Sequence, residues 1–195
     1  MTDEILESVA ARKGHFLLES GHHGELWLDL ELLCVNPDPV RRYAGAIAKH
    51  LAPHGIEMVC GPLVEGAFVG LLAALEMGVP FAYSEPVAGV SGDTLYPFSY
   101  RIPLNLRSRV RGKRVAIVND VINAGSAVRG TFAELQSCGA EPVAVGTILT
   151  LGPWAREFAD ANQIGLEALG ALSNSYWIPS ECPLCRSGVA LSSIE

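Results

Sequence analysis

The chain has 195 residues, of which 49% are hydrophobic and 18% are charged, enough for one domain with a sizeable core. Its formal net charge of −7 argues against a nucleic-acid or anionic-membrane surface. No apolar stretch reaches the roughly 20 residues of a membrane span, and the acidic start lacks the basic region of a signal peptide. We therefore expect a cytoplasmic protein without nucleic-acid or membrane partners, and its five cysteines are expected to be reduced thiols.

The first part of the chain predicts a helix and then a hairpin. Residues 4–11 have the pattern of a short amphipathic helix, which Gly14 ends. An extended segment follows, then a polar turn at residues 20–24 and an apolar extended segment at residues 26–30. His22 and His23 in this turn could suggest a metal ligand, but we expect solvated side chains in such a polar turn.

Strand–helix units come next. Asp38 as N-cap and Pro39 at the first helical position predict a helix to about Leu51. Residues 57–60 predict a strand that leads through a Gly-Pro-Leu-Val-Glu-Gly loop into an apolar helix at residues 67–77.

Residues 79–83 predict another strand, and residues 85–100 a long excursion of the kind that is usually functional or mobile. A cationic cluster follows this excursion, and it consists of Arg101, Arg107, Arg109, Arg111, Lys113 and Arg114. We expect the cluster to form a solvated face, although Arg101 could reach a ligand.

Residues 114–130 join a buried strand, a glycine-bearing turn and a helix start. The apolar run 115–118 predicts a central strand of a parallel sheet, which Asn119 and Asp120 end. At the carboxyl end of such a strand Asp120 can contact a ligand. The small residues of the turn let backbone N–H groups converge on an anion at a helix N-terminus. An ordinary loop capped by Ser126 is the alternative.

The remaining chain continues the strand–helix alternation. Residues 131–138 predict the rest of a helix with Gly139 as its cap, residues 142–149 a buried strand, residues 154–162 a helix, and residues 164–172 a weak strand. This pattern predicts an α/β fold with a doubly wound, mainly parallel sheet and helices on both faces.

Near the carboxyl end, Cys182 and Cys185 form one CxxC motif, which is half of a zinc knuckle. A tetrahedral zinc site needs about four ligands. Cys34, a histidine or a dimer mate could complete a structural Zn²⁺ site, and a packed carboxyl-terminal clasp without metal is the alternative.

The strand, Asp120, the Asn-Ala-Gly-Ser-Ala loop and the helix together resemble the phosphoribosyl-pyrophosphate (PRPP) motif of type I phosphoribosyltransferases. Residues 124–129 are most similar to the orotate phosphoribosyltransferase branch, and the resemblance extends more weakly over residues 14–150. It implies the type I phosphoribosyltransferase fold as one domain, 1–195, with an amino-terminal hood at about 1–35, a core at 36–172 and a tail at 173–195.

The resemblance implies transfer of ribose 5-phosphate from PRPP to a pyrimidine or related base with release of pyrophosphate, Mg²⁺ as cofactor, and a homodimer. It assigns the PRPP and 5′-phosphate contacts to Asn119, Asp120, Asn123, Ala124, Gly125, Ser126 and Ala127. It assigns the pyrophosphate loop to Leu63, Val64, Glu65 and Gly66, catalysis to Asp120 and Arg101, and base binding to Arg129 and Trp27.

The chain departs from the family pattern where charges are concerned. Glu19 stands where the family usually has a lysine, and Glu65 stands where many members have one. Asn119 replaces one of the two acidic residues that the family usually has there. Residues 85–99 contain no lysine or histidine. Three functions therefore stay open: an orotate enzyme with rearranged chemistry, a transferase for another base, and a non-catalytic binder of PRPP or a nucleotide.

Overall fold

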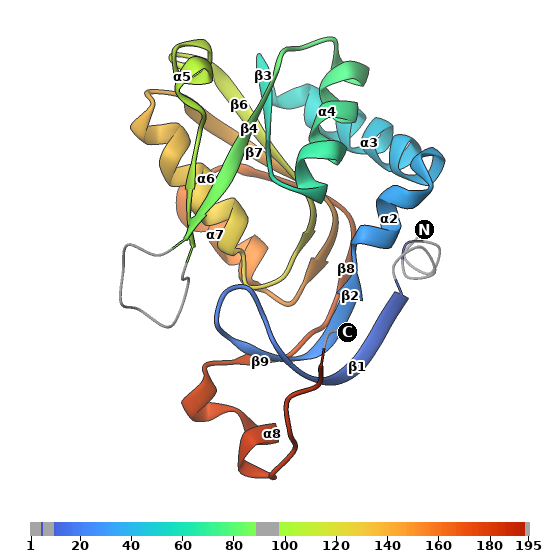
Figure 1. The fold of residues 1–195 in the computed structure, drawn as a ribbon. Coiled ribbons are helices and arrows are strands. Elements are labelled where there is room, and N and C mark those ends of the chain that lie inside the picture. Colours follow the sequence, from blue (N-terminus) through green and yellow to red (C-terminus); the bar gives the residue numbers. More distant parts are fainter. Residues whose placement is uncertain (1–4, 6–9, 89–97, 194–195) are drawn as a thin grey trace.

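The computed structural model describes residue 5 and residues 10–88 and 98–193, which form a six-stranded sheet between two layers of helices and a smaller sheet at one end (Figure 1). The strand order of the large sheet is β5-β4-β3-β6-β7-β8. Its strands are β3 (Met58–Pro62), β4 (Phe81–Ala88), β5 (Phe98–Arg101), β6 (Arg114–Ile122), β7 (Glu141–Leu151) and β8 (Gly165–Leu172).

The sheet is parallel except at one edge. β5 pairs antiparallel with β4, and Arg101 lies opposite Glu85 in their register. The two ends of the predicted excursion at residues 85–100 thus form a strand pair, while residues 89–97 lie outside the described residues.

Helices cover both faces of the sheet, which confirms the predicted doubly wound fold. One face carries α3 (Pro37–Leu51) and α4 (Glu65–Met77), and the other carries α5 (Leu104–Val110), α6 (Ser126–Ser137) and α7 (Trp154–Asn162). β6 shows why the sheet is buried on both sides, because alternate side chains enter opposite cores. Ala116 and Val118 pack in the core beneath α3 and α4, whereas Val115 and Ile117 pack in the core beneath α6.

Two boundaries differ from those predicted. α3 is capped by Asn36, whose side-chain oxygen accepts from the Asp38 backbone N–H at 3.4 Å, so the prediction of Asp38 as N-cap was wrong. β6 does not end at Asn119 and Asp120 but continues to Ile122, because β7 goes on pairing with it as far as Ile122 opposite Thr150.

A three-stranded sheet, which we call the hood sheet, consists of β1 (Ala10–Leu17), β2 (His23–Asp29) and β9 (Tyr176–Trp177) in that order. The predicted hairpin is confirmed as β1 and β2. Ala10 and Ala11 belong to β1 rather than to the predicted helix at residues 4–11, most of which lies outside the described residues, and Gly14 lies within the strand.

The carboxyl-terminal tail joins the hood sheet through β9, which pairs with β2. The tail continues through a 3-10 turn, η2 (Pro179–Glu181), and the short helix α8 (Pro183–Arg186), beside β1 and β2 in Figure 1. The other short elements are α2 (Glu31–Val35) and the 3-10 turn η1 (Ala52–His54). In the described part of the chain, no helix has both the length and the apolar character needed to cross a membrane.

Candidate active site

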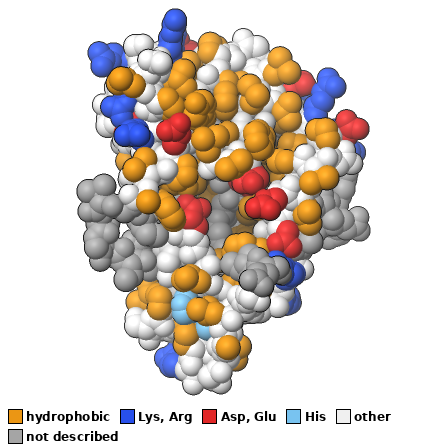
Figure 2. All heavy atoms as spheres, viewed as in Figure 1, with side chains coloured by type: hydrophobic (Ala, Val, Ile, Leu, Met, Phe, Trp, Pro, Cys, Tyr) orange, Lys and Arg blue, Asp and Glu red, His pale blue; other side chains and the backbone are white. Residues whose placement is uncertain are grey.

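A pocket of about 670 Å³ lies where the carboxyl ends of β3 and β6 meet the hood sheet, a size typical of small-molecule sites. Figure 2 shows a hollow between the two parts of the molecule, with acidic side chains around it. Three parts of the chain line the pocket: the hood at residues 18–20 and 26–32 with Arg12, the loop at residues 62–66, and the segment at residues 119–128, together with Tyr100 and Leu151.

The turn between β6 and α6 has the predicted strand–turn–helix geometry. Gly125 adopts a left-handed conformation with φ of 75°, and a Cβ atom there would overlap the indole ring of Trp154, so this position requires glycine. Gly125, and not Ser126, is the N-cap, and the Ser126 hydroxyl donates to Glu19. The amino end of α6 therefore borders the pocket with its first backbone N–H groups and the positive end of its dipole.

Asp120 lines this pocket and is only 5% exposed. The pKa of Asp120 is raised to about 7, mainly by burial and also by the carboxylates of Glu65 and Glu19, while a hydrogen bond from the Val121 backbone opposes the shift. Its backbone carbonyl accepts from the Thr147 hydroxyl of β7 at 2.8 Å. Asp120 is thus a rigidly placed carboxyl group that can be neutral or ionised near neutral pH.

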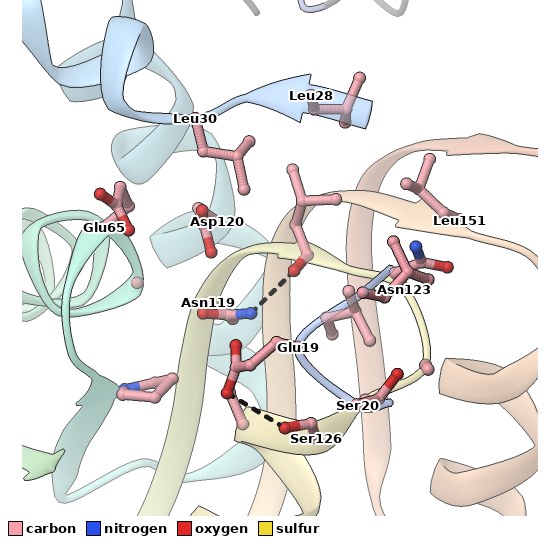
Figure 3. A pocket seen from close by; sticks show the side chains of 18 of the residues that line it. Glu19, Ser20, Leu28, Leu30, Glu65, Asn119, Asp120, Asn123, Ser126 and Leu151 are labelled. Atoms are coloured by element: carbon pink, nitrogen blue, oxygen red, sulfur yellow. Dashed lines mark hydrogen bonds between the residues drawn. The ribbon is translucent and has the colours of Figure 1, made fainter. Parts of the chain in front are cut away.

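Asn119 and Gly66, a residue of the predicted pyrophosphate loop, lie against each other in the pocket lining. The Asn119 amide donates to the Val121 carbonyl at 2.8 Å (Figure 3), and its oxygen lies where a Cβ atom on Gly66 would be. A side chain at position 66 would displace Asn119, so glycine allows α4 to begin next to β6. The Leu63–Val64 peptide bond in this loop is cis.

Glu19 reaches into the pocket from the β1–β2 turn (Figure 3). Its Oε1 atom accepts hydrogen bonds from the Tyr100 hydroxyl at 2.7 Å and from the Ser126 hydroxyl at 3.2 Å. Burial and the neighbouring Glu19 carboxylate raise the pKa of Tyr100 above its ordinary value, so Tyr100 acts as a donor.

Acidic side chains outnumber basic ones in the pocket. Among the described lining residues the acids are Glu19, Asp29, Glu31, Glu65 and Asp120, whereas the one base is Arg12. A pocket of this composition favours a ligand that arrives with metal cations or carries little negative charge of its own.

Arg12 is a site residue that the sequence did not indicate, because the prediction for its surroundings was a helix. It lies on β1 and donates to Asp29 at 2.9 Å, and Asp29 also accepts from the indole N–H of Trp27 at 2.8 Å. The Arg12 Nε atom is buried and has no hydrogen-bond partner among the residues that the structure describes. The Arg12 side chain as a whole is 41% exposed, so the accessible part of its guanidinium at the pocket wall is suited to an anionic group of a ligand.

The structure brings most of the predicted site residues together around this pocket. The lining contains all the residues predicted for PRPP and 5′-phosphate binding, the whole predicted pyrophosphate loop, and Trp27. Arg101 and Arg129 are absent from the lining. Arg101 is exposed on β5, and Arg129 is exposed in the first turns of α6. Their catalytic and base-binding roles stay predictions.

Three other members of the cationic cluster, Arg107, Lys113 and Arg114, form ion pairs outside the pocket. Arg107 pairs with Glu134 at 2.7 Å, Lys113 with Glu57 at 3.0 Å, and Arg114 with Glu141 at 3.0 Å. Lys113 and Arg114 lie at the amino end of β6, and the pocket lies at the carboxyl end of the same strand. These cations therefore do not offset the acidic pocket at close range.

The CxxC motif lies in the tail, outside the pocket lining. Cys182 and Cys185 meet His15 of β1 and His23 of β2, and one ligand atom from each of the four residues lies within 4.8 Å of the others. His22 and His23 are 8% and 7% exposed, so the expectation of solvated histidines in the turn was wrong. The folding of the tail onto the hood sheet buries them.

The chain is similar to known proteins along nearly its whole length, although no family model matches it. It is 28% identical over 191 residues to an orotate phosphoribosyltransferase from Thermotoga maritima, which covers 97% of this chain and 94% of that protein.

Among solved structures, an orotate phosphoribosyltransferase from Aeropyrum pernix superposes with a TM-score of 0.66 at 19% identity, covering 88% of this chain and 94% of the other. An adenine phosphoribosyltransferase from Thermoanaerobacter pseudethanolicus superposes with a TM-score of 0.64 at 17% identity, covering 88% and 100%. The two structures support the fold alone, because they share it while differing in the base that their names specify.

Proposed function

Because this chain is a divergent relative of the orotate phosphoribosyltransferases, we propose that it transfers ribose 5-phosphate from PRPP to a pyrimidine-type base and releases pyrophosphate. The observation that carries the proposal is the pocket between the hood sheet and the turn that leads from β6 into α6. There a buried carboxyl group, a left-handed glycine and a helix N-terminus follow one another within residues 120–126. This arrangement suits a sugar phosphate, with its phosphate at the helix and its ribose at the carboxylate.

The 5′-phosphate is assigned to the amino end of α6. Backbone N–H groups and the Ser126 hydroxyl would donate to the phosphate oxygens, and the helix dipole would favour the negative charge. Glu19 now accepts from the same hydroxyl, so it has to give way or to share this donor when a phosphate binds.

Asp120 is assigned to the ribose. The reaction passes through a cationic ribose centre, which an ionised carboxylate stabilises electrostatically. Because the pKa of Asp120 is about 7 in the free protein, a cationic centre or a bound cation would shift the group towards its ionised form. Asp120 would then be ionised in the transition state, where its negative charge stabilises the cationic ribose centre.

Mg²⁺ is the cofactor that this family implies, and the donor set of the pocket fits it in part. Carboxylate oxygens are suitable Mg²⁺ ligands, and Glu65 and Asp120 would hold the ion together with phosphate oxygens of the substrate. Among the described residues, no three pocket carboxylates come close enough to form a metal cage without the substrate. When bound, Mg²⁺ neutralises the pyrophosphate that leaves.

The base is assigned to the hood side of the pocket, where Trp27 and Arg12 lie. An indole ring can pack on a planar base, and a partly exposed guanidinium can bind a carboxylate such as that of orotate. Glu19 would repel a carboxylated base that came close to it, which keeps a transferase for another base as a second candidate.

A homodimer is supported by an exposed apolar stripe on α4. Phe68, Leu71 and Leu75 are 47%, 51% and 73% exposed and follow a helical spacing, and Val35 of α2 is 78% exposed. Figure 2 shows hydrophobic side chains gathered in the upper part of the molecule, where α4 lies in Figure 1. Leu71→Glu should convert the dimer to a monomer in sedimentation velocity, and Leu104→Glu on the opposite face of the sheet should not.

The experiment that tests the function is a pyrophosphate-release assay with PRPP, Mg²⁺ and a panel of bases that includes orotate, uracil and adenine. Rapid release with orotate alone supports the proposed activity, and release with a different base supports the second candidate. Binding of PRPP without release from any base would contradict both and indicate a non-catalytic binder.

A further inference from the structure

We propose that His15, His23, Cys182 and Cys185 bind one tetrahedral Zn²⁺ ion that fastens the carboxyl-terminal tail to the hood sheet. The four side chains converge from three separate parts of the chain, β1, β2 and the α8 region, and their ligand atoms all lie within 4.8 Å of one another. Two nitrogen and two sulfur ligands are a common donor set of structural zinc sites.

The spacing of the four ligand atoms fits a zinc ion at their centre. His15 Nε2 lies 2.9 Å from His23 Nδ1, 3.4 Å from Cys182 Sγ and 3.7 Å from Cys185 Sγ, and Cys185 Sγ lies 3.2 Å from His23 Nδ1. Zinc bond lengths of about 2.0–2.3 Å place tetrahedral ligands roughly 3.3–3.8 Å apart. These four separations are within a few tenths of an ångström of these values, and the two separations of Cys182 Sγ from His23 and from Cys185 Sγ are at most 4.8 Å.

The hydrogen bonding of His15 fixes which of its nitrogens faces the cluster. Its Nδ1 atom lies 2.8 Å from the Val189 carbonyl oxygen, which can only accept, so Nδ1 carries the proton and Nε2 presents its lone pair. A zinc-binding histidine typically donates a hydrogen bond from its other ring nitrogen to a group such as a backbone carbonyl.

The backbone of the hood sheet is shaped to bring the two histidines together. Lys13 pairs with Leu26 and Phe16 pairs with Gly24, so three residue steps along β1 correspond to only two along β2. The extra residue is a β-bulge around His15, and bulges redirect side chains. His23 lies directly opposite Trp177 of β9, so the pairing that brings in the tail also fixes the second histidine.

The tail presents its two thiols through a short turn. Cys182 is the N-cap of α8, its carbonyl accepts from the Arg186 N–H at 3.2 Å, and the Cys185 carbonyl accepts from the Gly188 N–H at 3.0 Å. These bonds close the chain around both sulfur atoms. Cys182 is fully buried and His15 is 1% exposed, so thiolates at this place need a cation to compensate their charge.

Four protein ligands leave no open position on the metal, which indicates a structural role and not a catalytic one. The metal would replace the two thiol protons, which are released on binding. It would also hold both ends of the turn that carries Glu19, because His15 and His23 flank the pocket-lining residues 18–20. This assignment is independent of the proposed transferase activity.

The test is the metal content of the untagged protein purified without chelators. We expect inductively coupled plasma mass spectrometry to find one zinc ion per chain. When Co²⁺ replaces the zinc, we expect the visible absorption bands of a tetrahedral site with thiolate ligands. Cys185→Ser, at the exposed ligand, and His15→Gln should lower the zinc content to near zero. The matched controls Cys34→Ser and His50→Gln, which lie outside the cluster, should keep it unchanged.

A second measurement keeps the test valid if a variant fails to fold. Stripping metal from the wild-type protein should speed hydrogen exchange at residues 15–24 and 176–192 and leave β6 and β7 unaffected, and restored zinc should reverse the change. Substoichiometric zinc with no cobalt spectrum would overturn the proposal. So would a disulfide between Cys182 and Cys185 in protein purified under reducing conditions.

Discussion

The carboxylate of Glu19 accepts a hydrogen bond from the hydroxyl of Ser126, with 3.2 Å between Oε1 and Oγ. Ser126 is the first residue of α6, so a side chain of the hood places a negative charge at the helix end that we assign to the 5′-phosphate. The Tyr100 hydroxyl donates to the same carboxylate oxygen at 2.7 Å and holds it there. The free protein thus fills part of its anion site with its own acid.

Glu19→Gln should tighten the binding of ribose 5-phosphate and PRPP, because it removes a charge that competes with the phosphate while it keeps an oxygen acceptor for Tyr100. We expect a gain of roughly 2- to 5-fold, which corresponds to the typical effect of a charge at a helix terminus. Isothermal titration calorimetry measures it. Glu25→Gln is the matched control, since Glu25 lies on the same hairpin but outside the pocket lining. Weaker binding by Glu19→Gln would show that Glu19 contributes to the ligand site.

Asp120→Asn should abolish pyrophosphate release and leave the fold intact. The amide has nearly the same size as the carboxyl group, but it cannot stabilise a cationic ribose centre. Pyrophosphate release and circular dichroism together check this expectation. Asp38→Asn, at an exposed position near the start of α3, should retain full activity. Wild-type turnover by Asp120→Asn would remove Asp120 from the reaction.

The same variant should change how stability depends on pH. The pKa of Asp120 is raised from 3.8 to about 7, so its stabilising contribution is fully present below pH 4 and is lost as pH rises through about 7. The wild-type protein without added Mg²⁺ should therefore lose up to about 4 kcal/mol of stability from this group, an upper limit at roughly 1.4 kcal/mol per pH unit. Asp120→Asn should lack this loss.

Urea denaturation of both proteins between pH 4 and pH 8 measures the difference. The two stabilities should be closest at pH 4, and the variant should be the more stable protein at pH 8. Parallel curves across this range would mean that the Asp120 carboxylate is ionised without cost in the folded state.

Arg12→Ala should weaken the binding of orotate at least about tenfold and affect uracil little, because a guanidinium paired with a carboxylate is strong and uracil has no carboxylate. Arg12→Lys should rescue only part of the loss, since an ammonium group cannot bind a carboxylate in a fork. Quenching of the tryptophan fluorescence is a suitable readout, because Trp27 shares Asp29 with Arg12.

Arg129→Ala is the informative comparison, because the resemblance assigns base binding to Arg129 whereas the structure places it on the exposed side of α6, outside the pocket lining. A larger orotate defect in Arg129→Ala than in Arg12→Ala would favour the assignment from the resemblance.

The acidic pocket also predicts an order of affinities. Without Mg²⁺, ribose 5-phosphate should bind at least as well as PRPP, since the pyrophosphate of PRPP would face Glu65 and the other lining acids. Mg²⁺ should favour PRPP selectively, because it neutralises the added phosphates. Calorimetric titrations of both ligands with and without Mg²⁺ test the order, and tight binding of PRPP in the absence of divalent cations would contradict it.

The sequence alone determined the parallel strands of the large sheet and the turn that leads from β6 into α6, but not the antiparallel edge strand β5. The apolar run in β6, the small residues before α6 and the regular strand–helix alternation are local signals, because burial on both faces and a tight turn each restrict the residue types nearby. Asn123 to Ala127 therefore lie where the sequence placed them. The CxxC motif was likewise visible as half of the zinc site that we propose.

The tertiary structure alone decided the contacts between segments that are distant along the chain. Cys182 lies 167 residues from His15, and Tyr100 lies 81 residues from Glu19. The bulge that turns His15 inward and the pairing of β9 with β2 have no local signature, since each depends on how the tail packs against the hood sheet. Burial of Asp120 and the charge balance of the pocket arise in the same way, because solvent exclusion and electrostatic repulsion depend on what surrounds a side chain in space.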